Sequence, residues 1–60
     1  MTPAIELVRC LPAGGVARLV REDRPGAAPS WAVVVLARGR SLRVRYFDAR
    51  PVALLWFDSL

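Results

Sequence analysis

The chain has no histidine, lysine, asparagine or glutamine, and Cys10 is its only cysteine. Without a second cysteine no internal disulfide can form, and without histidine the common zinc-ligand sets and the usual general base are missing. The five carboxylates are scattered along the chain, and no glycine-rich phosphate-binding motif is present. We therefore expect a protein that is not an enzyme and that uses neither a metal nor a cofactor.

The chain is short for its apolar content. Its 60 residues allow one small β domain, which we place at residues 1–60. A chain of this length buries only about 60% of its unfolded surface, so its margin of stability is thin. Hydrophobic residues nevertheless make up 55% of the chain, and its mean hydropathy is +0.35. Because so small a sphere has little interior, we expect a homo-oligomer or a larger protein partner to cover the excess apolar surface.

Nothing in the sequence indicates a membrane. No stretch approaches the ~20 apolar residues of a membrane-spanning helix, because prolines and a glycine interrupt the longest uncharged run, residues 25–37. The first residues lack the basic region and apolar core of a signal peptide. A lone cysteine agrees with a reducing compartment. We therefore expect a cytoplasmic protein without membrane contact.

The first half of the chain has the pattern of β structure. Residues 4–11 and 16–22 are predicted strands, and the Pro-Ala-Gly-Gly turn between them predicts a hairpin. Residues 23–30 contain two prolines and a glycine, which indicates a loop. Residues 31–38 include three consecutive valines and are apolar on both faces. Such a segment predicts a strand covered on both sides.

Residues 39–47 predict a second hairpin. Gly39 and Arg40 suit the centre of a two-residue turn, and residues 41–47 then alternate clearly. Such alternation is typical of a half-exposed strand. One face of this strand would carry Arg43, Arg45 and Phe47, and the other Leu42, Val44 and Tyr46.

Residues 51–60 fit either a strand or a helix. As a helix, the segment would begin with Asp48 as its N-cap and Pro51 in its first turn. The face of that helix would group Val52, Leu55, Trp56 and Ser59. The short aromatic run favours a strand. Five short strands predict an all-β domain, a small five-stranded antiparallel barrel or curled sheet of the SH3-like or OB-like kind; the alternative is an α+β domain with a short C-terminal helix.

The excess positive charge is concentrated in one hairpin. Residues 38–50 carry five arginines against Asp48, a net charge of +4, whereas the rest of the chain is neutral. Guanidinium groups pair with phosphates, and an aromatic ring on the same face can stack on an unpaired base. This predicts nucleic-acid binding, with Phe47 or Tyr46 stacking on bases. The predicted contacts are Arg38, Arg40, Arg43, Arg45, Phe47 and Arg50.

Other interpretations remain open. The arginines also suit a solvated sheet face, an acidic protein partner or a nucleotide. A second hypothesis is a protein-interaction module, an accessory, inhibitory or subunit protein that docks through its excess apolar surface. The predicted interface residues are Trp31, Val34, Leu36, Leu55, Trp56 and Phe57. We expect both tryptophans to anchor the core or an interface, each with its indole N–H bonded to a backbone carbonyl.

Overall fold

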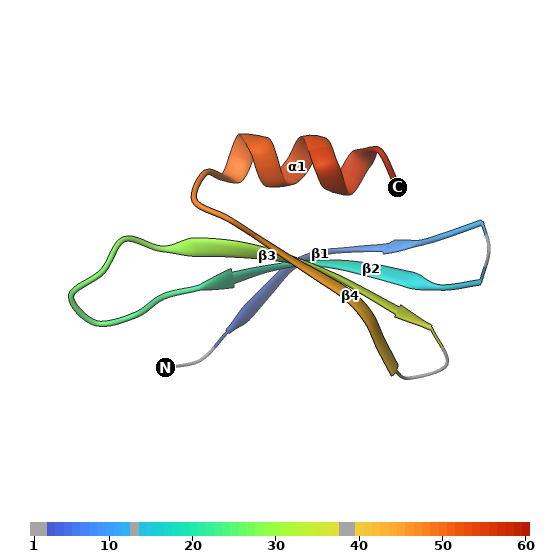
Figure 1. The fold of residues 1–60 in the computed structure, drawn as a ribbon, viewed down its shortest axis with the longest axis horizontal. Coiled ribbons are helices and arrows are strands. Elements are labelled where there is room, and N and C mark those ends of the chain that lie inside the picture. Colours follow the sequence, from blue (N-terminus) through green and yellow to red (C-terminus); the bar gives the residue numbers. More distant parts are fainter. Residues whose placement is uncertain (1–2, 13, 38–39) are drawn as a thin grey trace.

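The computed structural model describes residues 3–12, 14–37 and 40–60 as one antiparallel sheet with a helix on one of its faces (Figure 1). The elements are β1 (Ala4–Cys10), β2 (Val16–Glu22), β3 (Ser30–Ala37), β4 (Arg40–Phe47) and α1 (Arg50–Asp58). Their order in the sheet is β1-β2-β3-β4, so each strand pairs with its neighbours along the chain. A mostly β fold is thus confirmed. The predicted five-stranded barrel is wrong, because this sheet has four strands and is open, with β1 and β4 at its edges.

The predicted fifth strand is the helix α1. Its first turn contains Pro51, which is tolerated there because the first amide groups of a helix have no intrahelical partner. Ala49 is the N-cap residue and makes no side-chain cap, so the predicted capping role of Asp48 is wrong. A strand in this place would have left one of its two apolar faces without a cover. The helix instead turns one apolar side to the sheet.

The side of α1 that faces the sheet differs from the predicted one. Ala53 and Phe57, four residues apart and therefore on one side of the helix, are buried against the sheet. Val52 and Leu55, which were predicted to share the packed side, are 52% and 73% exposed. The true packing side thus begins one position later in the sequence than predicted.

The core lies between α1 and the two central strands. Leu19 of β2 pairs with Val33 of β3, and both side chains are fully buried. Burial of side chains of this size contributes about 1.5–3 kcal/mol each. Ala17 beneath the helix and Ala53 within it are small, and both are completely buried. Among the described elements, α1 covers only this face of β3; no helix lies over the opposite face, which was predicted to be covered as well.

The glycine-rich turn between β1 and β2 forms as predicted. The Leu11 amide donates to the Gly15 carbonyl oxygen over 2.8 Å, and Gly14 takes a positive φ of 94°. At the other hairpin, the structure places Arg40 in β4 instead of in the turn. Arg38 and Gly39, which were assigned to that region, lie outside the described residues.

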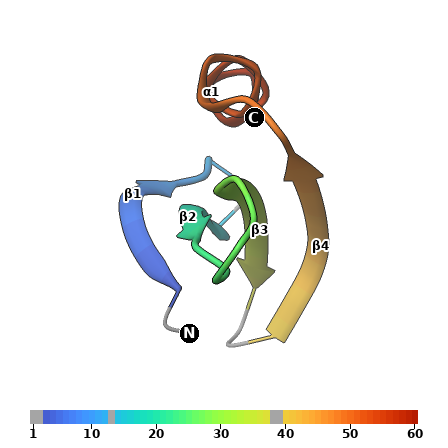
Figure 2. The same cartoon turned by 90° about the vertical axis from the view of Figure 1, so that its left-hand side faces the viewer.

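The sheet is strongly twisted. The two edge strands cross in Figure 1, and the view along the long axis shows them flanking β2 and β3 below the helix (Figure 2). Right-handed twist of successive strands accumulates in this way. α1 has nine residues, and no helix in the described part of the chain is long and apolar enough to cross a membrane.

Candidate nucleic-acid interface

Cross-strand pairing places the arginines of β4 on the face of the sheet that carries α1. Arg43 pairs with Val35 and Arg45 with Val33, and both valines are buried. The predicted alternation of β4 is therefore confirmed for these two arginines. The face they occupy is the covered side of the sheet, at its edge, where the short helix does not reach across the whole of β4.

A β-bulge adds a third arginine to the same side. Arg40 pairs with Ala37 and Ser41 with Leu36, but the next pair is Arg43 with Val35, so β4 has one extra residue at position 42. Arg40 precedes Arg43 by three positions, and simple alternation would put them on opposite faces. The extra residue of the bulge shifts the alternation by one position, so Arg40 and Arg43 lie on the same face of the sheet. We call Arg40, Arg43 and Arg45 the arginine row.

Trp56 of α1 lies beside the arginine row. Arg43 Cζ is 5.8 Å and Arg45 Cζ 5.7 Å from the centroid of the Trp56 ring. Arg45 Cζ also lies 6.0 Å from the Phe47 ring, whose centroid is 6.1 Å from that of Trp56. Cation–π contacts at such exposed sites contribute about 0.5–1 kcal/mol each. They also limit the directions that the two guanidinium groups can take.

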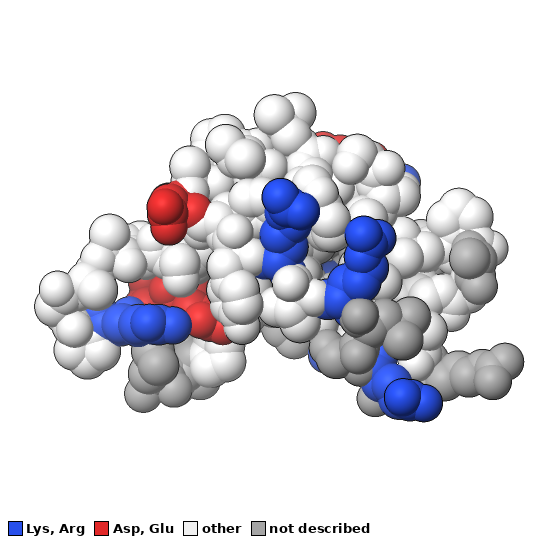
Figure 3. All heavy atoms as spheres, in the orientation of Figure 1, with Lys and Arg blue, Asp and Glu red and all other residues white. Residues whose placement is uncertain are grey.

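The arginine row carries unbalanced positive charge. All three of its residues are exposed, and space-filling atoms show arginine side chains along the course of β4 (Figure 3). Among the described residues no carboxylate lies within ion-pair distance of the row. The ion pairs among the described residues all involve other arginines. They join Arg21 to Asp23, Arg24 to Glu22, and Arg50 to Glu6.

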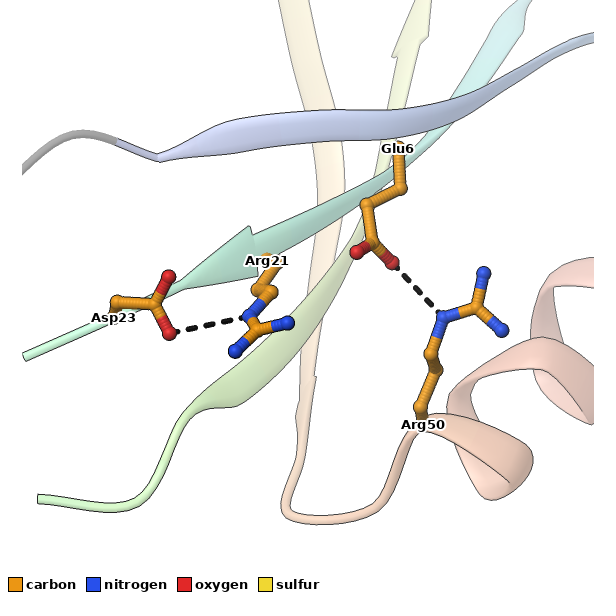
Figure 4. A network of polar contacts seen from close by, with 4 residues as sticks. All are labelled: Glu6, Arg21, Asp23 and Arg50. Atoms are coloured by element: carbon orange, nitrogen blue, oxygen red, sulfur yellow. Dashed lines mark hydrogen bonds and ion pairs between the residues drawn. The ribbon is translucent and has the colours of Figure 1, made fainter.

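Arg50, which was predicted to share this surface, is held elsewhere. Its Nε donates to Glu6 Oε1 over 3.0 Å, toward the opposite edge of the sheet (Figure 4). Glu6 lies at an irregularity between the Ile5 and Leu7 pairs of β1, and this bulge directs its carboxylate toward α1. The charge of Arg50 is thus balanced by a carboxylate. Arg38 lies outside the described residues.

Tyr46 and Phe47, the two predicted stacking residues, lie on opposite faces of the sheet. Tyr46 is 63% exposed but pairs with Ala32 on the face opposite the arginine row. Phe47 lies on the side of the row, half-buried against Trp56. Trp56 is therefore the aromatic residue nearest to the row, and it was missed as a contributor. Interpreting residues 51–60 as a helix that returns over the sheet would have indicated it.

The predicted interface residues do not form one surface. Val34 lies on the face opposite α1, as does Leu36, whereas Leu55 points outward from the helix and Phe57 belongs to the core. Trp31 is half-buried below Arg21, whose Cζ is 5.9 Å from its ring centroid. Its Nε1 is buried without a hydrogen-bond acceptor in the described residues, so the expected bond to a carbonyl is wrong.

Within residues 3–12, 14–37 and 40–60 there is no pocket, and no three His, Cys, Asp or Glu side chains lie together as metal ligands would. Comparisons of the chain with protein-family models, curated proteins and solved structures gave no match. Two surfaces are left from which to infer a function. One is the arginine row, and the other is the apolar face of the sheet opposite α1.

Proposed function

We propose that the protein binds nucleic acid through the arginine row. The observation that supports this is a line of three exposed arginines on an edge strand, without a carboxylate partner in the described residues. The planar guanidinium group matches the oxygens of a phosphate in a bidentate manner, and it stays charged at every physiological pH. An edge strand is also accessible along its length, so an extended backbone can lie beside it.

The geometry of the row favours the phosphate backbone as its ligand. Arg43 and Arg45 are alternate residues of a strand, so their Cα atoms are ~6.7 Å apart, close enough for the two side chains to reach neighbouring phosphates. Contact with Trp56 restricts both side chains before binding. A restricted side chain loses less conformational entropy when it binds, which raises affinity.

Base recognition has a smaller part in this proposal. Phe47 and Trp56 are half-buried and pack on each other, so neither ring offers an open platform for a base. Contacts to phosphates position a protein on nucleic acid but carry no sequence information. We therefore expect binding with little sequence preference.

Fluorescence anisotropy with labelled single-stranded and duplex oligonucleotides, titrated across salt, tests the proposal. We expect affinity to fall with salt at a log–log slope of about −2 to −3, as three neutralised phosphates require. The double variant Arg43→Glu/Arg45→Glu should abolish binding while the circular dichroism spectrum stays unchanged. Absence of binding at low salt would contradict the proposal.

The matched control for this surface is a charge reversal at the far end of the sheet. Arg24→Glu changes the net charge by the same amount as Arg43→Glu, but Arg24 lies in the loop after β2. We expect Arg43→Glu to weaken binding far more than Arg24→Glu. Equal losses would mean that net charge, and not the arginine row, is responsible.

A protein-interaction module is the second candidate function. It is favoured by the sheet face opposite α1, where Ile5, Val8, Val44 and Tyr46 are 45–63% exposed. Contiguous apolar surface of this kind is typical of a contact with another protein. We place either function in the cytoplasm, a compartment in which a lone cysteine stays reduced.

A further inference from the structure

The face of the sheet opposite α1, here called the open face, carries an uncovered apolar layer. Its pairing brings together two adjacent rows across all four strands. The large apolar side chains of these rows are Ile5, Val8, Val20, Val34, Val44 and Tyr46. The chain exposes 4295 Å² in total. A compact monomer of its mass is expected to expose roughly 3,900 Å², so the excess fits a sheet with one face uncovered.

Two charged residues of β2 interrupt this layer. Arg18 is exposed inside it, between Val8 and Val34, and has no carboxylate within ion-pair distance in the described part of the chain. Glu22 follows four residues later and therefore lies on the same face, at its margin. The nearest cation to Glu22 is Arg24, at a long 3.9 Å. The open face thus carries one positive and one negative group, placed on either side of Val20.

We propose that a second copy of the chain covers the open face, with Arg18 of each copy paired to Glu22 of the other. A two-fold axis that runs in the plane between the two sheets produces this pairing. The axis is perpendicular to the strands and passes over Val20, midway between Arg18 and Glu22. It lays β2 antiparallel over β2 of the second copy. The apolar row through Val20, which contains Ile5 and Tyr46, then packs on the same row of the other copy, and two ion pairs form by symmetry.

The structure favours a second copy over an unrelated partner because the face complements itself. A two-fold axis along the strands would lay Arg18 over the apolar β3 of the other copy and bury an unpaired guanidinium, which is strongly unfavourable. The layer of four strands measures roughly 19 Å by 20 Å in plan. With the loop at residues 23–29, which extends beyond the sheet (Figure 1), its burial on both copies approaches the size of small specific interfaces.

This arrangement also brings the two arginine rows to the same edge of the dimer. Because β2 lies over β2, each β4 lies over the β4 of the other copy, and both rows fall on the same edge of the dimer. Because the open faces are turned toward each other, the two rows lie on the two outer faces of the dimer, beside this shared edge. This consequence rests on the proposed function, whereas the dimer itself does not and is measured without nucleic acid.

Sedimentation equilibrium of four proteins tests the pairing by a charge swap. The native chain should form a dimer, and Arg18→Glu or Glu22→Arg alone should raise its dissociation constant by roughly tenfold or more, because like charges then face each other. The double variant Arg18→Glu/Glu22→Arg should restore it. A monomeric native chain would overturn the proposal, as would single variants that dimerise normally.

A control on the helix separates the open face from the other exposed apolar surface. Leu55→Glu places a charge on the outer side of α1, where Leu55 is 73% exposed, and should leave the dissociation constant unchanged. If Leu55→Glu disrupts the dimer, the helix forms the interface and the proposal is wrong.

A measurement on the native chain covers the case in which a charge variant fails to fold. In a mixture of isotope-labelled and unlabelled protein, filtered NMR spectra report only contacts between copies. We expect such contacts among Tyr46, Val20 and Val34 of the open face. Contacts confined to α1, or none at all, would contradict the proposal.

Discussion

Arg9 of β1 caps the C-terminal end of α1: its Nη1 donates to the carbonyl oxygen of Asp58 over 2.9 Å, across 49 positions of sequence. The same nitrogen donates to the Phe57 carbonyl over 3.0 Å. The last carbonyls of a helix have no intrahelical partner, and a cation near them also complements the helix dipole. One side chain therefore ties the end of the helix to an edge strand.

Arg9→Ala should destabilise the fold by about 1–2 kcal/mol, because two charge-assisted hydrogen bonds at a partly exposed helix end are lost. Urea unfolding followed by circular dichroism measures the change. Arg24→Ala serves as the control, since Arg24 is exposed and its pairing with Glu22 is long. We expect less than about 0.5 kcal/mol for this control. Equal effects would mean that the capping contact contributes nothing.

The arginine row and Arg50 should differ in how they affect the salt dependence of nucleic-acid binding. Arg40→Ala should reduce the log–log slope by about 0.9 on duplex, since one phosphate contact disappears. Arg50→Ala should change the slope little, because the charge of Arg50 is already balanced by Glu6 at 3.0 Å. Anisotropy titrations at several salt concentrations give both slopes. A larger effect of Arg50→Ala would place the contact surface at the start of α1.

Two apolar residues of α1 should respond very differently to truncation. Phe57→Ala should cost about 3–5 kcal/mol, because Phe57 is buried in the core. Leu55→Ala removes an exposed side chain and should change the free energy of unfolding by less than about 0.5 kcal/mol. Thermal unfolding of both variants measures the difference. Similar losses would show that α1 packs through another side.

Gly15→Ala should destabilise the first hairpin by about 1–3 kcal/mol. A Cβ atom at this position would lie 2.9 Å from the Leu36 carbonyl oxygen, which belongs to the backbone and cannot easily move. The cause here is contact, unlike at Gly14, where a positive φ of 94° is the constraint and the space is open. Urea unfolding of the Gly15 variant checks the expectation, and a neutral result would show that β3 can shift at Leu36.

The sequence predicted the strands of this protein better than it predicted which face of each strand is covered. Alternation put Arg43, Arg45 and Phe47 on one face of a strand, because a period of two is a local property. It could not show that this face is the one beside α1. That depends on which side of the sheet the last segment packs, and this segment is apolar in either interpretation. The Ala-Leu-Leu run at residues 53–55, which has high helix propensity, was the available signal for a helix.

The remaining features depend on distant residues or on single irregularities. The contact between Arg9 and Asp58 joins the two ends of the fold and leaves no trace in local pattern. The bulges in β1 and β4 change the register by one residue each, and no residue type at those positions requires them. Both bulges nevertheless matter to the candidate surfaces, since they direct Glu6 and Arg40.

The bulge in β4 makes the charge of this edge a matter of strand register as well as of composition. Regular pairing of residues 40–43 without the bulge would place Arg40 on the open face, three positions before Arg43. Loss of the bulge would thereby remove a cation from the row and insert it into an apolar layer. Substitutions along this edge can vary one surface at a time, but a shift of register alters both together.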